Sequence, residues 1–212
     1  MPKLYRPTKL SMYLRKDQLP ILAVNMLVLS AFALTFTASK NYEFLFYIGE
    51  IVFFVFVIVA SNRRVNYSND ILWGLTVWVA MHLSGGGLYL GGTKLYDTML
   101  IPLSDTYEIL KYDQVVHAFG FGVATLVMYH LLRPQLKEGA RAWASLSIVL
   151  VMAGLGAGAL NEIVEFAATV IVSDTGVGGY INNSLDLVFN LVGAIVAMVF
   201  IRVREGHSVI HD

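Results

Sequence analysis

Cysteine is absent from the 212 residues of the sequence, and charged residues are scarce. The absence of cysteine excludes disulfides, thiolate metal ligands and cysteine nucleophiles. Charged side chains make up 14% of the sequence and the formal net charge is zero, so the chain lacks the long-range positive potential that attracts nucleic acid. We therefore expect neither nucleic acid as a partner nor a nucleotide as a cofactor.

Hydrophobic residues, by contrast, make up 57% of the sequence, against roughly 45–50% in ordinary soluble domains. They form runs of about the 20 residues that a helix needs to cross a bilayer. Such runs lie at 19–39, 44–60, 71–90, 112–132, 143 to about 172, and 185–203. This pattern predicts an all-α, polytopic membrane helix bundle with six transmembrane helices.

No linker separates these runs, so we expect a single transmembrane domain over 19–203, preceded by a basic segment over 1–18 and followed by a tail over 204–212. The segment 4–19 is amphipathic, and we expect it to lie along the inner membrane surface. A secretory signal peptide is the alternative interpretation of the first run. That run is longer than the typical hydrophobic region of about 7–15 residues, which favours a permanent anchor helix.

Basic residues predict the orientation of the helices. All but three of the 15 lysines and arginines lie before the first run or after the second, fourth and sixth runs. The exceptions are Lys40, Lys94 and Lys111, which lie in the alternate segments. Because Lys and Arg are retained on the cytoplasmic side in short loops, both termini are expected in the cytoplasm.

Two segments are rich in glycine. Gly154 and Gly158 form a G-x-x-x-G pair within the fifth run, which predicts close packing of helix backbones in lipid. The second segment, from Gly85 to Gly92, is interpreted as a flexible outer turn. A backbone anion-binding site is the weaker alternative there.

Ionisable side chains inside a membrane span are costly and are functional candidates by default. We find seven, with four asparagines among them: Glu50, His82, Asp113, His117, Glu162, Glu165 and Asp186, with Asn161, Asn182, Asn183 and Asn190. The predicted orientation and the rise of about 1.5 Å per residue place all seven in the outer half of the membrane. Several are three or four residues apart and so share a helix face. We therefore predict one polar site near the external surface.

The five acidic members of this set repel one another, and the predicted spans contain no Lys or Arg to balance them. Two like charges about 4 Å apart cost roughly 4 kcal/mol even at an effective dielectric of 20. Protonated carboxyls, cationic histidines or a divalent metal can compensate this charge. The candidate metal ligands suit Zn, Mn or Fe without selecting one; they are His82, Asp113, His117, Glu162 and Asp186.

Taken singly, these residues have blander interpretations. His82 can be an interior hydrogen-bonded histidine, Glu50 can face interfacial water, and Asp113 and Asp186 can cap helix starts. His130, His207 and His211 lie on the predicted inner side or in the tail, and we expect them to be solvated.

Three pieces of sequence resemble the VanZ-like group of bacterial membrane proteins and the related YjdF-like proteins, whose function is largely unknown. They are Tyr-Asp-Gln-Val-Val-His at 112–117, Asn-Glu-Ile-Val-Glu at 161–165, and the segment 182–190 followed by Gly193. The resemblance covers about 71–203 and departs from the pattern at Gln114 and at 182–183, where relatives carry basic residues. It implies a multi-pass protein of the bacterial cytoplasmic (inner) membrane, with some relatives linked to glycopeptide resistance. It also points to five of the residues selected above: Asp113, His117, Glu162, Asp186 and Asn190.

Three functions remain open. The first is metal-dependent chemistry on a lipid or lipid-linked envelope precursor, with Glu162, Glu165 and His117 as catalytic groups and with Glu50, Asn161, Asn183 and Asn190 in support. The second is a proton- or ion-coupled transporter. The third is a non-catalytic scaffold in which the polar cluster locks the helices together. Membrane lipids are the expected partners in all three cases.

Overall fold

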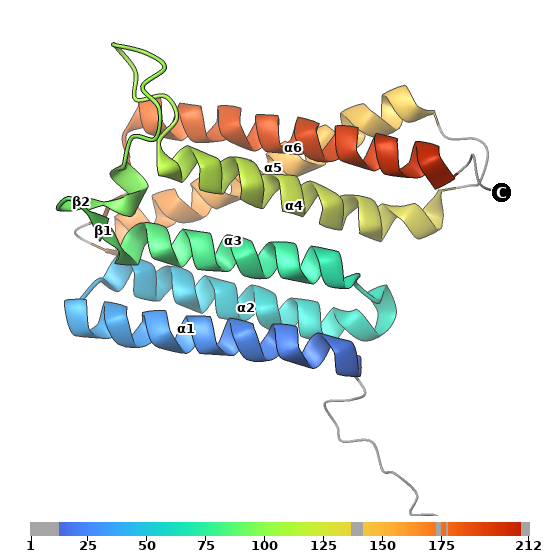
Figure 1. Cartoon of the computed structure of the whole chain (residues 1–212), viewed down its shortest axis with the longest axis horizontal. Coiled ribbons are helices and arrows are strands. Elements are labelled where there is room, and N and C mark those ends of the chain that lie inside the picture. Colours follow the sequence, from blue (N-terminus) through green and yellow to red (C-terminus); the bar gives the residue numbers. More distant parts are fainter. Residues whose placement is uncertain (1–12, 137–141, 173–174, 177, 209–212) are drawn as a thin grey trace, which may run out of the picture.

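Six helices lie side by side in the computed structural model, which describes residues 13–136, 142–172, 175–176 and 178–208 (Figure 1). These helices are α1 (Leu19–Ser39), α2 (Tyr42–Val65), α3 (Asn69–Gly87), α4 (Tyr112–Leu132), α5 (Trp143–Ile171) and α6 (Tyr180–Ser208). Each predicted apolar run therefore corresponds to one helix, although the third helix ends at Gly87 and not at residue 90. Most of the predicted surface segment over 4–19, part of the tail, and His211 lie outside the described residues, as does the side chain of His207.

Five of the described helices are long and apolar enough to cross a membrane by length and composition: α1, α2, α4, α5 and α6. Helix α3 is not among them, because Asn69, Asp70 and His82 lower its hydropathy. Large apolar side chains on the outer surfaces of the bundle are widely exposed, such as Leu34 at 74% and Val170 at 71%. Hydrocarbon is the natural solvent for these faces.

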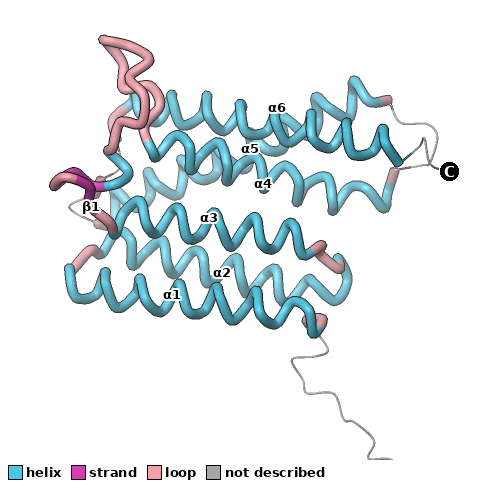
Figure 2. Tube along the Cα trace, in the orientation of Figure 1, coloured by secondary structure: helices cyan, strands magenta, loops and turns pink. Residues whose placement is uncertain are grey.

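The connection between α3 and α4 is the longest in the part of the chain that the structure describes (Figure 2). That connection begins with a hairpin of β1 (Tyr89–Leu90) and β2 (Thr93–Lys94). Gly91 and Gly92 form its tip with positive φ angles of 59° and 87°, which favour glycine. The 3-10 helix η3 (Leu95–Asp97) follows. Met99 then forms an isolated antiparallel bridge with Lys111, the residue just before α4.

The prediction of a flexible turn from Gly85 to Gly92 is wrong for its first half. Gly85, Gly86 and Gly87 form the last turn of α3. A Cβ atom on Gly86 would lie 2.0 Å from the ring of Phe44, and one on Gly85 would lie 2.6 Å from the ring of Tyr96. These glycines therefore make room for aromatic side chains packed against the helix.

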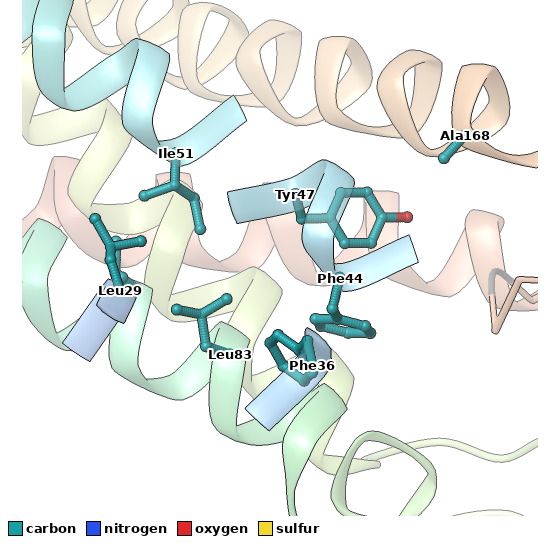
Figure 3. Close-up of a cluster of buried hydrophobic side chains, with 8 residues drawn as sticks. Leu29, Phe36, Phe44, Tyr47, Ile51, Leu83 and Ala168 are labelled. Atoms are coloured by element: carbon teal, nitrogen blue, oxygen red, sulfur yellow. The ribbon is translucent and has the colours of Figure 1, made fainter. Parts of the chain in front are cut away.

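An apolar cluster joins the first three helices at the end of the bundle that carries the hairpin. Leu29 and Phe36 from α1, Phe44, Tyr47 and Ile51 from α2, and Leu83 from α3 point toward one another, and Ala168 of α5 lies beyond the ring of Tyr47 (Figure 3). Because lipid is as apolar as these side chains, close packing rather than burial from water holds such helices together.

The opposite end, where α1 begins and α6 ends (Figure 1), carries most of the described arginines. The side chain of Gln18 bonds to Asn62 and to the carbonyl of Tyr67. His130, expected to be solvated, is half-buried instead. Its ring stacks on Tyr67 at 5.7 Å between centroids, and its Nε2 lies 3.2 Å from the carbonyl oxygen of Val65. The end of α4 packs against the α2–α3 turn and shields it.

Glycines let α4, α5 and α6 approach very closely. A Cβ atom on Gly193 would lie 1.9 Å from the carbonyl oxygen of Ala118, and one on Gly154 would lie 2.0 Å from Thr125 Oγ1. A Cβ atom on Gly158 would lie 2.5 Å from Asn190 Nδ2. The close packing predicted from the G-x-x-x-G pair is confirmed, and it brings the polar side chains of three helices together.

We predict that Gly193→Ala destabilises the protein, because the new methyl group meets a backbone carbonyl that cannot move aside. Overpacking of this kind costs about 1–3 kcal/mol. Gly156→Ala is the matched control, since a Cβ atom there meets nothing within 4 Å and alanine favours the helix. Thermal unfolding in detergent, followed by circular dichroism, should show a lower midpoint for Gly193→Ala only. Equal midpoints for the two variants would contradict the tight α4–α6 contact.

Candidate functional site

His117 lies at the centre of a buried polar cluster between α4, α5 and α6. Its imidazole Nε2 lies 3.5 Å from Asp113 Oδ1, one helical turn earlier on α4. From α5, Glu162 Oε1 lies 3.6 Å from Nδ1 and Glu165 Oε1 lies 4.0 Å from Nε2. The imidazole is 5% exposed. Carboxylates from two helices therefore face both nitrogens of one buried ring.

Helix α6 closes the cluster with Asp186 and Asn190, which lie one turn apart. Asn190 Oδ1 lies 3.0 Å from His117 Nδ1, and Asp186 is 1% exposed. Asp186 lies well inside α6, which begins at Tyr180, so it does not cap the helix. Asp113 lies in the first turn of α4, whose N-cap residue is Lys111.

Three asparagine amides donate hydrogen bonds to these carboxylates. Asn161 Nδ2 donates to Glu165 at 2.7 Å and Asn183 Nδ2 donates to Glu162 at 2.6 Å. Asn182 Nδ2 donates to Asp186 at 2.6 Å and lies 3.4 Å from Asp113 Oδ2. Neutral amides hold the carboxylates in place but supply no positive charge.

Several buried polar atoms of the cluster have no hydrogen-bond partner among the described residues: Glu162 Oε1, Asp186 Oδ1 and Asn190 Nδ2. A buried polar atom without a partner costs about 1–3 kcal/mol, and more if it is charged. Two of the three atoms are carboxylate oxygens that face the same imidazole region. A cation in the cluster would give the two carboxylate oxygens a partner and would offset part of the negative charge.

The donor set fits a divalent metal ion. Asp113, His117 and Asp186 form one group of donor atoms within 4.8 Å of one another, and His117, Glu162 and Glu165 form a second. Histidines that bind metals usually donate their second ring N–H to an oxygen, and the Asn190 carbonyl oxygen provides that acceptor for Nδ1. Nε2 then has no proton. It faces Asp113 and Glu165 with a lone pair that can bind a metal ion.

His82 and Glu50 lie outside both of these groups. The His82 ring packs against Phe44, Tyr47 and Trp78, and its Nδ1 lies 2.5 Å from the hydroxyl of Tyr96. Glu50 is half-buried on α2. The structure thus brings five of the predicted ionisable residues into the two groups. It leaves Glu50 and His82 outside them, although His82 lines the same cavity as Asp113 and Glu165.

Two cavities flank the cluster. A polar cavity of about 80 Å³ is lined by the His82 and Tyr96 rings and by polar side chains, among them Asp113, Glu165, Asn182, Glu43, Asp97, Lys94 and Lys111. A wider, more apolar cleft of about 480 Å³ is lined by Glu162 and Asn183 together with Ile163, Phe166, Thr169 and Tyr180. Glu162 and Glu165 therefore form part of the wall between the two.

Sequence reasoning missed several residues of the polar cavity. Glu43 is buried and accepts a hydrogen bond of 2.7 Å from the backbone N–H of Gly176; it lies one residue before the second apolar run. Lys94, Tyr96 and Lys111 come from the long connection, which has no periodicity to indicate their position. Burial, with Asp113 nearby, raises the pKa of Tyr96 well above its ordinary value.

Gln114, which departs from the VanZ-like pattern, has a clear structural role. Its Oε1 accepts the backbone N–H groups of Leu110 and Lys111 at 2.5 and 3.1 Å, and its Nε2 donates to the Glu108 carbonyl oxygen at 2.8 Å. The side chain is fully buried. Gln114 therefore fixes the end of the connection against the start of α4.

Long apolar helices that enclose a buried cluster of histidine and carboxylates identify a helical membrane protein. The chain belongs to the family described as "Predicted membrane protein (DUF2238)", whose family model matches residues 19–207. No curated protein and no solved structure shows a significant match to the chain.

We predict that Glu162→Gln leaves the metal-free protein as stable as the wild type or makes it more stable. The substitution keeps an acceptor for Asn183 while it removes one of several charges that repel at short range. Glu162→Ala is the comparison, because it leaves the Asn183 amide without its acceptor, at a cost of about 1–3 kcal/mol. Thermal unfolding in the presence of a chelator measures both. A loss of stability in Glu162→Gln as large as in Glu162→Ala would contradict the charge argument.

Proposed function

We propose that this protein is a metal-dependent enzyme of the bacterial cytoplasmic membrane that acts on a lipid or lipid-linked envelope substrate. One observation carries the proposal. Four carboxylates from three helices surround His117, and two of their buried oxygens have no partner among the described residues. A structural lock between helices needs no such atoms, because each unpartnered oxygen weakens it.

In this proposal all six helices cross the membrane, α3 included, and both termini are cytoplasmic. The described basic residues support that orientation. Arg15, Arg63, Arg133 and Arg202 lie at or near helix ends on the side where α1 begins and α6 ends, and Lys40, Lys94 and Lys111 lie on the other side. By the positive-inside rule the cluster then lies toward the external surface.

The residues divide into two roles. His117, Asp113, Asp186 and Glu165 hold the ion, which when bound supplies Lewis acidity or an activated water. Glu162 acts as the general base, since its Oε1 has no partner and its side chain lines the apolar cleft. His82 and Glu50 are not part of this ligand set.

The cleft beside Glu162 supports a lipid substrate. Its wall includes Phe166 at 67% and Ile163 at 61% exposure, and in a membrane these side chains face acyl chains. Glu162 and Asn183 form the polar part of the same cleft. An amphiphile can therefore enter sideways with its chain in lipid and its polar part at the cluster.

Polar groups deeper in the bundle have local partners, which supports a one-sided site rather than a transport route. Asn25 Nδ2 donates to the carbonyl oxygen of Ile21 at 2.9 Å and to Thr76 Oγ1 at 2.6 Å. Thr76 in turn donates to the carbonyl oxygen of Leu72 at 2.8 Å. Within the described residues, this pair does not extend the cluster.

We predict that Mn²⁺ or Zn²⁺ binds the chelator-treated protein and stabilises it. An ion at a hundred times its dissociation constant adds about 2.7 kcal/mol to the free energy of unfolding. His117→Gln and Asp186→Asn should each lower the affinity for the ion at least about tenfold. Asp70→Asn, an exposed change at the opposite end, is the control. Calorimetric titration that detects no binding, or equal binding by all variants, would refute the metal proposal.

The enzymatic part requires a separate test in cells. Envelope lipids should be compared by mass spectrometry in a strain lacking the gene and in the same strain expressing the wild type, Glu162→Gln or Asp70→Asn. We expect one lipid species to accumulate in the deletion strain and in Glu162→Gln, and to disappear with the wild type and Asp70→Asn. Restoration of the wild-type profile by Glu162→Gln would argue against catalysis by this residue.

A further inference from the structure

Two lysines line the polar cavity beside the carboxylates. Lys94 ends strand β2 and Lys111 is the N-cap residue of α4, and both line the cavity together with Asp113 and Glu165. They come from the connection between α3 and α4, outside the helices that form the cluster. The cavity therefore holds two ammonium groups together with the carboxylates of Glu43, Asp97, Asp113 and Glu165.

Lys111 is deeply buried for a lysine. The residue is 8% exposed, and its ammonium lies 3.1 Å from Glu108 Oε2, whose side chain is 74% exposed. An ammonium taken out of water is costly unless it is well paired, and an exposed carboxylate is a weak partner because solvent screens it. The carboxylates that line the cavity, Asp113 among them, offset part of this cost, and an anion that enters the cavity would offset more of it.

Lys94 reaches the cavity through a space left by Gly176. A Cβ atom on Gly176 would lie 2.9 Å from Lys94 Nζ and 3.4 Å from Glu43 Oε2. The ammonium also lies 5.9 Å from the centroid of the Phe44 ring, which offers it a weak cation–π contact. A side chain at position 176 would displace this ammonium from the cavity.

The surrounding contacts fix both lysines. Tyr96, two residues after Lys94, is anchored among aromatic rings by its hydrogen bond to His82. Gln114 holds the backbone N–H of Lys111. These contacts fix the backbone on either side of the cavity lining and so limit where the two ammonium groups can lie.

We infer that Lys94 and Lys111 bind a phosphate group of the substrate and hold it against the metal side of the cavity. Two ammonium groups and a divalent ion offer the charge and the donors that a phosphate takes. The cavity of about 80 Å³ has room for a group of that size. The adjacent apolar cleft makes a lipid phosphate the favoured source. This inference rests on the proposed function for the role of the metal.

The probe is dioctanoyl phosphatidic acid, and dioctanoylglycerol, which differs from it only by the phosphate, is the matched neutral lipid. Binding to the purified full-length protein is measured by calorimetry with Mn²⁺ and again with a chelator. We expect phosphatidic acid to bind at least about tenfold more tightly than dioctanoylglycerol. Lys94→Gln and Lys111→Gln should each remove about tenfold of that affinity, and Lys40→Gln, at the same end but outside the cavity lining, should remove none.

If Lys111→Gln folds poorly, Lys94→Gln still tests the inference. Mn²⁺ binding that is unchanged in a lysine variant shows that its cluster of carboxylates is intact. Equal affinity of the wild type and Lys94→Gln, or of the two lipids, would overturn the inference. Inorganic phosphate as a competitor identifies the source: displacement at similar concentrations supports a free phosphate, and weak displacement supports a lipid phosphate. If phosphatidic acid binds through the lysines but Mn²⁺ does not bind, the proposed function is wrong and the anion site stands. If Mn²⁺ binds but the lysine substitutions do not change the affinity for phosphatidic acid, the anion site is wrong and the proposed function stands.

Discussion

The balance of charge around His117 is the constraint on which the rest of this structure depends. Four carboxylates lie in a space closed by three helices, with one imidazole at their centre. Hydrocarbon around the bundle screens these charges poorly. The asparagine amides orient the carboxylates but leave their charge in place. A bound cation meets this constraint, offers partners to the orphaned oxygens and explains why so many acidic groups share a buried site.

The cluster exists because glycine removes side chains at three helix contacts. Without a Cβ atom at Gly193, the backbone of α6 approaches α4 at Ala118, and at Gly158 the missing Cβ atom leaves space for Asn190. Asn190 then reaches His117 and fixes its ring. Helix packing and site geometry are thus one feature: the same small residues that bring the helices together also orient the imidazole.

Much of the fold could be predicted from the sequence, because a helix in lipid satisfies all of its own backbone hydrogen bonds and so appears as an uninterrupted apolar run. The pairs Asp113–His117 and Glu162–Glu165 predicted a shared site, since three- and four-residue spacings place side chains on one helix face. The direction in which a helix face points is set by packing, however, and spacing does not reveal it. His82 therefore packs among aromatic rings and borders the cavity, but it is outside both groups of donor atoms.

Residues of irregular segments were beyond prediction for a related reason. Lys94, Tyr96 and Lys111 reach the cavity through a hairpin and a returning loop, whose path depends on contacts distant in sequence. Glycines 85–87 looked like a flexible turn, although the rings of Tyr96 and Phe44 make them part of a packed helix. His130 looked solvated because nothing in the sequence indicates its stacking on Tyr67.

The central claim is that the carboxylates and His117 enclose a metal ion. The most direct measurement is an anomalous difference map from crystals grown with Mn²⁺ and recorded near the manganese absorption edge. The account predicts a peak about 2.0–2.3 Å from His117 Nε2 and from oxygens of at least two of the surrounding carboxylates. A map with no peak in the cluster, at a concentration of Mn²⁺ that saturates ordinary protein sites, would contradict it.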